Sequence, residues 1–236
     1  MTDASRPPAR PTGLADAPGR RALLALLIAG VLVFGVLAVL VAARWAPLVD
    51  LDASTTATTY HAALSTGWLR TAARAVTAVG SPTTVDVVAA AAVAGLALTR
   101  RWSPALAVLA ARLVELGIES AIKVVLDRPR PVFTPQLAVA SGASFPSGHA
   151  AGSAAVYVVL LLLAMPWLGR RWRGVVAVAV AVLLVLAIAS TRLLLGVHYP
   201  SDVVAGLGLG VACAAAAVLL TRTWRRPGQS PEPSAM

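Results

Sequence analysis

Long apolar runs, separated by short polar segments, dominate this chain. Six such runs cover residues 22–43, 83–99, 103–122, 149–168, 174–191 and 201–221. A helix needs roughly 20 predominantly apolar residues to cross the hydrocarbon layer of a bilayer, whereas a surface helix of a soluble protein is apolar on one face only. The pattern therefore predicts an all-α fold, a polytopic membrane bundle of six transmembrane helices.

The two ends of the chain differ from its middle. Residues 1–21 are rich in Pro, Ala and Arg, and residues 222–236 are polar and contain several prolines. Both compositions are typical of disorder, which leaves residues 22–221 as one membrane domain. The first apolar run could instead be a signal peptide. It is longer than the ~7–15 apolar residues usual in such peptides, which favours an anchoring helix.

Residues 46–80 form the longest segment between two predicted spans. One helical face of this segment carries mostly apolar side chains, namely Tyr60, Leu64, Trp68, Leu69, Ala72, Val76 and Val79. We therefore expect an amphipathic helix that lies at the membrane surface. It could be a simple connector, or it could guide a lipid substrate.

Composition and charge narrow the classes of partner. The chain is 58% hydrophobic and only 13% charged, with a net charge of +10. The arginines stand in small clusters beside apolar runs, as expected at membrane flanks, and no basic patch is suited to a nucleic acid. The bilayer is the expected partner, without nucleic acid, and protein partners stay unknown. Cys213 is the single cysteine, which excludes a disulfide framework.

The distribution of basic residues predicts an orientation. With the N-terminus inside, the inner segments hold twelve arginines, and the outer segments hold seven basic residues. Because basic residues accumulate on the cytoplasmic side, both termini are predicted to be cytoplasmic. We expect an integral protein of the plasma (inner) membrane, with its most polar segments facing outside.

Those polar segments contain the candidate chemistry. The only lysine and two of the three histidines fall within Lys123–Pro131, Pro146–His149 and Thr191–Asp202. Such groups are costly near a bilayer unless they serve a function. The cations of Lys123, Arg130 and Arg192 can surround a phosphate dianion. Ser147 and Gly148 directly precede the fourth span, and they place backbone N–H groups at a helix N-terminus, where anions bind.

The histidines suggest how such a phosphate would react. Asp202 follows His198 by four residues, so its carboxylate can fix the tautomer of the ring and leave the other nitrogen free to attack phosphorus. We expect a phosphohistidine intermediate on His198. His149 is the candidate general acid for the leaving group. The cations stabilise the transferred phosphoryl group, so no metal or other cofactor is required.

These three motifs resemble the signature of the type 2 phosphatidic acid phosphatase family, K-x6-R-P, P-S-G-H and S-R-x5-H-x3-D. The first two match fully, and the third matches except that Thr191 replaces the usual Ser and keeps its hydroxyl. The resemblance implies a membrane-embedded lipid phosphatase with the roles given above. It also implies a site shared with vanadium-dependent haloperoxidases.

The substrate class stays open at this level. Phosphatidate-like lipids and polyprenyl pyrophosphates such as undecaprenyl pyrophosphate both fit, and the second is preferred because a bilayer-embedded site suits a very long tail. The largely apolar loop Val132–Phe145 is expected to border the site. The main alternative is a transporter that binds phospholipids or polyprenyl phosphates without hydrolysis. A haloperoxidase-like oxidant is disfavoured by the membrane spans.

Three further features have competing interpretations. Arg128 could bind substrate or be an exposed loop residue. Arg112, Glu115, Glu119 and Lys123 share one face of the third span, where ion pairs inside the bundle are favoured over a polar path beneath the site. Gly206, Gly208 and Gly210 indicate close helix packing rather than a ligand loop.

Overall fold

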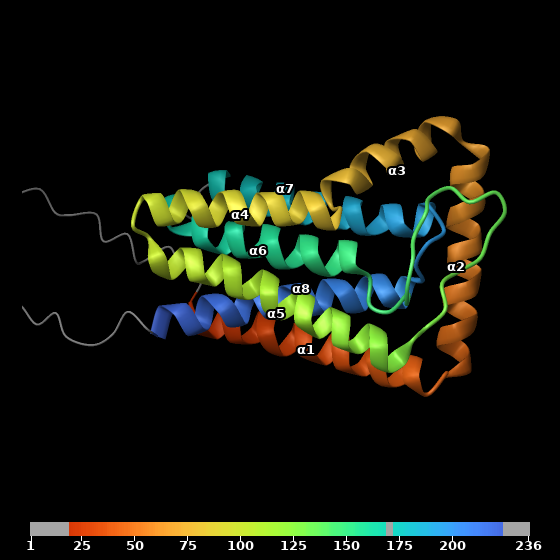
Figure 1. Ribbon diagram of the computed structural model, residues 1–236, viewed down its shortest axis with the longest axis horizontal. Helices are drawn as coiled ribbons and strands as arrows, with labels where there is room; N and C mark the ends of the chain where they lie inside the picture. Colours follow the sequence, from red (N-terminus) through yellow and green to blue (C-terminus); the bar gives the residue numbers. More distant parts are fainter. Residues whose placement is uncertain (1–18, 169–171, 224–236) are drawn as a thin grey trace, which may run out of the picture.

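A computed structural model describes residues 19–168 and 172–223. Within these ranges every regular element is an α-helix, which confirms the predicted all-α class (Figure 1). The helices are α1 (Arg20–Ala42), α2 (Ala46–Ser65), α3 (Gly67–Val79), α4 (Pro82–Leu98), α5 (Trp102–Leu126), α6 (Gly148–Leu168), α7 (Trp172–Leu194) and α8 (Pro200–Thr223). Most of the predicted terminal segments, 1–21 and 222–236, lie outside the described residues.

Six of these helices coincide with the six apolar runs of the sequence and form one bundle (Figure 1). Five described segments are long and apolar enough to cross a membrane: 20–42, 67–98, 148–168, 172–194 and 200–222. The helix α5 is long enough but carries four charged residues. The chain is an integral membrane protein, and the count of six spans stays a prediction.

Helix α8 lies at the centre of the bundle and contacts α1, α5 and α6 most extensively. Its glycines permit a close approach to α6. A methyl group at Gly206 would lie 2.6 Å from the carbonyl oxygen of Ser147, and one at Gly210 would lie 2.3 Å from that of Ala151. The predicted packing role of these glycines is confirmed. The N-terminal turn of α6 is thereby held directly against the start of α8.

The outward faces of the bundle are apolar. Helices α1 and α7 expose large aliphatic side chains that would be unfavourable in water but match hydrocarbon, among them Leu32, Val36, Val39, Val175 and Leu183. By contrast, α8 is largely buried along its length. The chain therefore surrounds a buried central helix with helices whose outer sides suit lipid.

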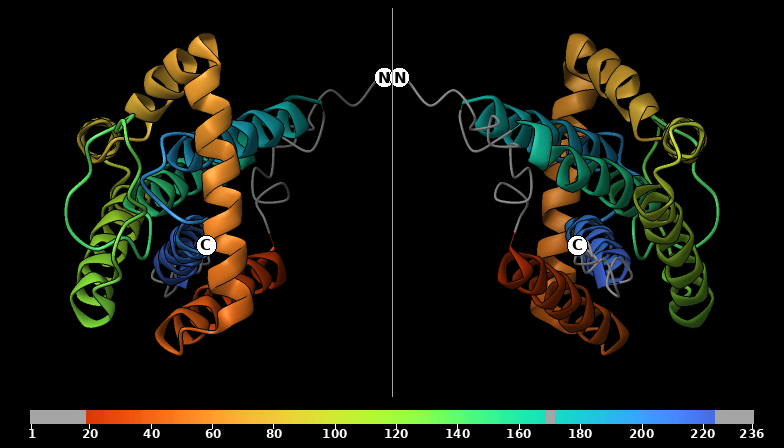
Figure 2. Two further views of the ribbon diagram at one scale, coloured as in Figure 1. Left: turned by 90° about the vertical axis from the view of Figure 1, so that its right-hand side faces the viewer. Right: turned by 90° about the vertical axis from the view of Figure 1, so that its left-hand side faces the viewer.

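The segment 46–80 is two helices rather than the single amphipathic helix expected. Thr66 is extended and separates α2 from α3. Helix α2 runs across the ends of the bundle helices, and α3 leads back toward α4 (Figures 1 and 2). The expected apolar face is divided between the two helices: Tyr60 of α2 is buried together with Asp52 and Thr56, at intervals of four residues, whereas Trp68 of α3 is 73% exposed. The polar groups against which α2 packs therefore determine which face of this helix is buried.

The contact between α6 and α8 predicts a selective effect of small substitutions. We expect Gly210→Ala to destabilise the fold by about 1–3 kcal/mol, because the added methyl group would overlap the backbone of α6. Gly95→Ala in α4 is the matched control, since a methyl group there meets nothing within 4 Å. Thermal unfolding of the purified chain in detergent measures both. Equal melting temperatures for the two variants would contradict the packing described.

Candidate active site

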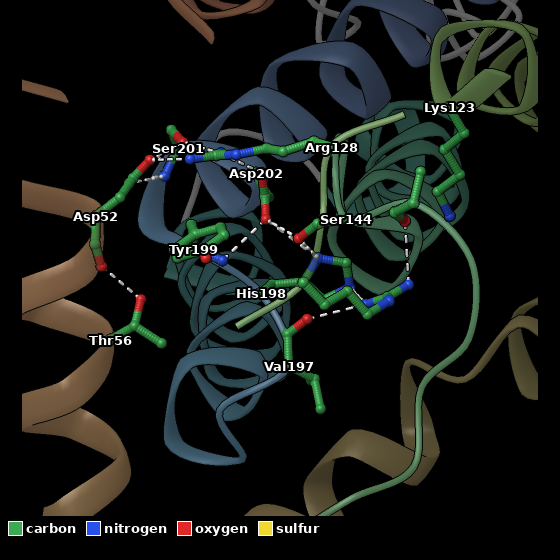
Figure 3. Close-up of polar contacts among 12 residues, drawn as sticks. Asp52, Thr56, Lys123, Arg128, Ser144, Val197, His198, Tyr199, Ser201 and Asp202 are labelled. Atoms are coloured by element: carbon green, nitrogen blue, oxygen red, sulfur yellow. Dashed lines mark hydrogen bonds and ion pairs between the residues drawn. The ribbon is translucent and has the colours of Figure 1, made fainter. Parts of the chain in front are cut away.

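The three polar segments of the sequence meet at the end of the bundle that α2 crosses (Figures 1 and 3). The backbone N–H of Ser147 donates to the carbonyl oxygen of Asp202 at 2.9 Å, which ties the second segment to the third. Nη1 of Arg130 lies 3.0 Å from Nε2 of His198, which ties the first to the third. Residues up to about 80 positions apart in sequence thus form one site.

Asp202 is positioned by the start of α8. Pro200 is the first residue of the helix, and the carboxylate of Asp202 accepts the backbone N–H of Tyr199 at 2.9 Å, as an acidic residue in a first helical turn often does. The same oxygen, Oδ2, lies 3.5 Å from Nδ1 of His198. Ser144 donates a hydrogen bond to this oxygen, and its own Oγ also lies 3.5 Å from Nδ1. Ser144 was not predicted, because no motif spacing distinguishes it from other loop serines.

The hydrogen bond from Arg130 determines the tautomer of His198. A guanidinium group can only donate, so Nε2 is the unprotonated acceptor and the proton resides on Nδ1, beside Asp202 and Ser144. His198 is almost fully buried. This burial lowers the pKa of His198 to about 4, with Arg130 and Arg192 acting in the same direction and Asp202 opposing them. At neutral pH the ring is neutral, with a lone pair on Nε2, the state that a nucleophile needs.

Arg130 differs from the open phosphate ligand that the sequence suggests. Its five N–H donors are all engaged: Nε binds the carbonyl oxygen of Gly142, Nη1 binds Val197 O and His198 Nε2, and Nη2 binds the carbonyl oxygens of Ser141 and Ala143. The guanidinium therefore links the loop 132–145 to His198 through hydrogen bonds. A bound phosphate would have to replace some of these carbonyl partners.

Two other predicted ligands do have unused donors. Ser147 Oγ and Arg192 Nε are buried and find no hydrogen-bond partner among the described residues. Arg192 is anchored on its other side, where Nη1 donates to Thr77 Oγ1 at 2.6 Å. Buried donors without acceptors are costly, so each of these atoms favours the binding of an anion. The ring of His149, in the first turn of α6, lies within electrostatic reach of Arg192, His198 and Lys123.

Lys123 is neutralised by a neighbour on the preceding turn of α5. Its Nζ donates to Glu119 Oε1 at 2.5 Å, and this carboxylate lies against Gly148, where a methyl group would be 2.3 Å from Oε1. An acidic side chain thus occupies the N-terminus of α6, the place where the phosphate is expected. Nearer the start of α5, Arg112 pairs with Asp86 at 2.7 Å and with Glu115. The favoured interpretation of these charges as ion pairs is confirmed.

Arg128 is held by two carboxylates of the protein. Its guanidinium bridges Asp202 and Asp52, at 2.6 and 2.7 Å, and stacks 4.3 Å from the ring of Tyr199. The interpretation as an exposed loop residue is wrong, because its side chain is only 13% exposed. Asp52 of α2 could not be identified from the sequence, because no motif contains it.

A cavity of about 320 Å³ opens beside the site. Its walls include Tyr60 of α2, the loop residues Phe133 and Gly142, and the site residues Arg130 and Val197. The loop Val132–Phe145 borders the site, as predicted. Because this cavity combines an aromatic wall with the Arg130 guanidinium, it suits the region where an anionic headgroup joins an apolar chain.

The chain belongs to the PAP2 superfamily, whose model matches residues 101–226, slightly more than half of the chain. Phosphatidylglycerophosphatase B of Bacillus subtilis (strain 168) is 34% identical over 97 residues, 40% of this chain and 46% of that protein. The decaprenylphosphoryl-5-phosphoribose phosphatase of Mycolicibacterium smegmatis (strain ATCC 700084 / mc(2)155) is 40% identical over 126 residues, 52% of this chain and 61% of that protein. The chain thus spans about half to three fifths of the length of these relatives.

Two solved structures share the fold. The crystal structure of a transmembrane PAP2 type phosphatidylglycerolphosphate phosphatase from Bacillus subtilis superposes with a TM-score of 0.69 over 83% of this chain and 95% of its own, at 24% identity. LpxE of Aquifex aeolicus superposes with a TM-score of 0.58 over 72% and 95%, at 20% identity. At these identities the likeness shows the fold alone.

The buried, neutral state of His198 can be observed directly. Because burial disfavours the charged form, we expect the ring to stay neutral as the pH falls from 8 to 5, with Nε2 unprotonated, and to titrate near pH 4. The ¹⁵N chemical shifts of histidine-labelled protein measure this, and His198→Ala assigns the signal among three histidines. A midpoint above pH 6 or a proton on Nε2 would contradict the geometry described.

Proposed function

We propose that this protein is an integral membrane lipid phosphatase that hydrolyses a phosphomonoester or pyrophosphate lipid through a phosphohistidine on His198. The observation that carries the proposal is the state of that ring. Its Nε2 is unprotonated, its Nδ1 faces Asp202, and the buried donors Ser147 Oγ and Arg192 Nε lack partners among the described residues. A lipid-binding protein without chemistry needs the cations, but it does not need an oriented neutral imidazole.

Binding would begin with an exchange of anions. The phosphate accepts hydrogen bonds from Ser147 Oγ, Arg192 Nε and the backbone N–H groups at the start of α6, where a helix N-terminus favours negative charge. It takes the place of the Glu119 carboxylate beside Gly148, and Lys123 then pairs with the phosphate. Arg130 releases loop carbonyls and His198 Nε2 to bind phosphate oxygens, which frees the nitrogen for attack.

The chemical step transfers the phosphoryl group twice. The negative charge of the bound phosphate stabilises the protonated form of His149. Nε2 of His198 forms a bond to phosphorus while the bond to the lipid oxygen breaks, and the protonated His149 donates its proton to that oxygen. Asp202 stabilises the positive charge that develops on the His198 ring, as the carboxylate of a catalytic triad does. His149, now neutral, then takes a proton from water, which attacks phosphorus and releases inorganic phosphate from His198. The cations stabilise charge on the equatorial oxygens in both transfers.

The substrate class is an amphiphile whose phosphate lies at the depth of the lipid headgroups. The site lies at one end of a bundle whose outer surface suits hydrocarbon, so the lipid tail can stay in the bilayer during catalysis. We favour a polyprenyl phosphate or pyrophosphate over a phosphatidate-like lipid. The name of the Mycolicibacterium relative, a decaprenylphosphoryl-5-phosphoribose phosphatase, supports this order, and the phosphatidylglycerophosphatase relative supports the second class.

We further propose that the site faces outside and that both termini are cytoplasmic. At the opposite end of the bundle α1 begins with Arg20 and Arg21, the turn between α4 and α5 holds Arg100 and Arg101, and α8 ends just after Arg222. This accumulation of arginine away from the site supports the orientation, because basic residues are enriched on the cytoplasmic side.

Phosphate release by the purified chain tests the proposed function. We expect hydrolysis of undecaprenyl pyrophosphate, phosphatidate or phosphatidylglycerophosphate in detergent containing EDTA, and slow or no hydrolysis of a soluble ester without a tail. His198→Ala should lower kcat by at least about 10⁴-fold while the protein stays folded, because it removes the nucleophile. His61→Ala, an exposed histidine of α2, is the matched control and should keep full activity.

The panel also separates the alternatives. Tight binding of these lipids without phosphate release by the wild-type chain would favour the transporter. Full turnover by His198→Ala would remove the nucleophile assignment.

A further inference from the structure

One buried carboxylate near the site has no part in the proposed reaction. Asp52 lies in the middle of α2, a helix outside the matched residues 101–226, and it is fully buried. A carboxylate is seldom fully buried unless its oxygens are satisfied by hydrogen bonds or a counterion. The hydrogen-bond partners of Asp52 therefore show which groups α2 helps to position.

Asp52 contacts the start of α8 through both oxygens. Oδ1 accepts the backbone N–H of Ser201 at 2.9 Å, and Oδ2 accepts the hydroxyl of Ser201 at 2.5 Å. The N–H groups in the first turn of a helix have no partner within the helix, so Asp52 caps α8 from a distance of 149 residues in the chain. Its negative charge also suits the positive end of the α8 dipole. Asp52 thus fixes the turn that precedes Asp202.

The second connection runs through Arg128. Asp52 Oδ2 accepts Nη2 of Arg128 at 2.7 Å, while Nη1 of the same guanidinium donates to Asp202 Oδ1 at 2.6 Å and to Ser201 Oγ at 2.7 Å. Figure 3 shows Asp52, Ser201 and Arg128 on one side of Asp202, with His198 on the other. Because Arg128 holds Oδ1, the carboxylate cannot rotate, and Oδ2 stays directed at His198, Ser144 and the Tyr199 N–H.

We infer that Asp52 is a positioning residue for the proposed reaction, acting through Arg128 and Ser201 on Asp202 and thereby on His198. This inference rests on the proposed function. It makes α2 part of the catalytic unit rather than a simple connector between spans. Asp52 itself touches neither His198 nor the donors assigned to phosphate, so its effect should fall on the chemical step rather than on substrate binding.

The test compares Asp52→Asn with Asp50→Asn. Asparagine keeps the size of Asp52 but removes the charge that holds Arg128, whereas Asp50 is exposed on the same helix. Formation of the lipid product from the substrate that the wild-type chain hydrolyses gives kcat and KM, and competitive inhibition by inorganic phosphate reports the phosphate-binding donors. For Asp52→Asn we expect a loss in kcat of roughly 10- to 100-fold, the range found when residues that orient an active group are changed. KM and the inhibition constant of inorganic phosphate should stay within about twofold. Asp50→Asn should match the wild-type chain.

Each other result overturns the inference. Wild-type kcat in Asp52→Asn would show that Asp202 is positioned without α2. A rise in KM and in the inhibition constant of inorganic phosphate that accompanies the fall in kcat would assign Asp52 to the general fold. If Asp52→Asn does not yield folded protein, Ser201→Ala decides, since it removes the hydroxyl between Asp52 and Arg128; we expect a several-fold lower kcat at unchanged KM, and unchanged kcat overturns the inference. An inactive wild-type chain would instead refute the proposed function.

Discussion

The structure depends on keeping one carboxylate, that of Asp202, charged and immobile at the end of a bundle whose surroundings are apolar. A buried carboxylate is costly unless hydrogen bonds and a cation compensate it. Here Arg128 binds one oxygen, and the Tyr199 N–H and the Ser144 hydroxyl bind the other. Arg128 and Ser144 come from the loop 127–147 and Tyr199 precedes α8, while Asp52 of α2 binds Arg128, so satisfying Asp202 brings this loop, the start of α8 and helix α2 into one place.

The same requirement explains how the site is arranged without a phosphate. Its cations are matched by groups of the protein itself: Glu119 for Lys123, and loop carbonyl oxygens and His198 Nε2 for Arg130. Among the buried side-chain donors in the described part of the chain, Ser147 Oγ and Arg192 Nε are left unmatched. In this account, Lys123 and Arg130 exchange hydrogen-bond partners when substrate binds. The phosphate dianion replaces one carboxylate and several carbonyl groups. A ligand with less charge than a phosphate would gain less from this exchange.

The sequence predicted those features that follow from local pattern. Apolar runs predicted the six bundle helices, glycine spacing predicted close helix packing of α8, and the motifs with the predicted topology placed Lys123, His149 and His198 at one end of the bundle. It could not predict partners that tertiary contacts choose. Asp52 belongs to a segment with no motif, Ser144 is one serine among several in its loop, and the bonds of Arg130 depend on how that loop closes.

The segment 46–80 shows why such features escape pattern analysis. The sequence pattern considers only water and lipid as surroundings of this segment. In the structure α2 turns Asp52 inward, because this carboxylate accepts hydrogen bonds from buried donors at the start of α8 and on Arg128. The most informative polar residue of this helix is therefore hidden from any rule that places apolar residues inside. A similar reason explains why Arg128 looked exposed from sequence.

The central claim, that His198 carries the phosphoryl group, is tested most directly by rapid quenching of the enzyme during turnover of a lipid labelled with ³²P in its transferred phosphate. The account predicts label bound to the protein, stable in base and labile in acid as expected for a phosphohistidine, located on His198 and lost in His198→Ala. Sustained turnover by the wild-type chain without any labelled protein, or label that persists in His198→Ala, would contradict it.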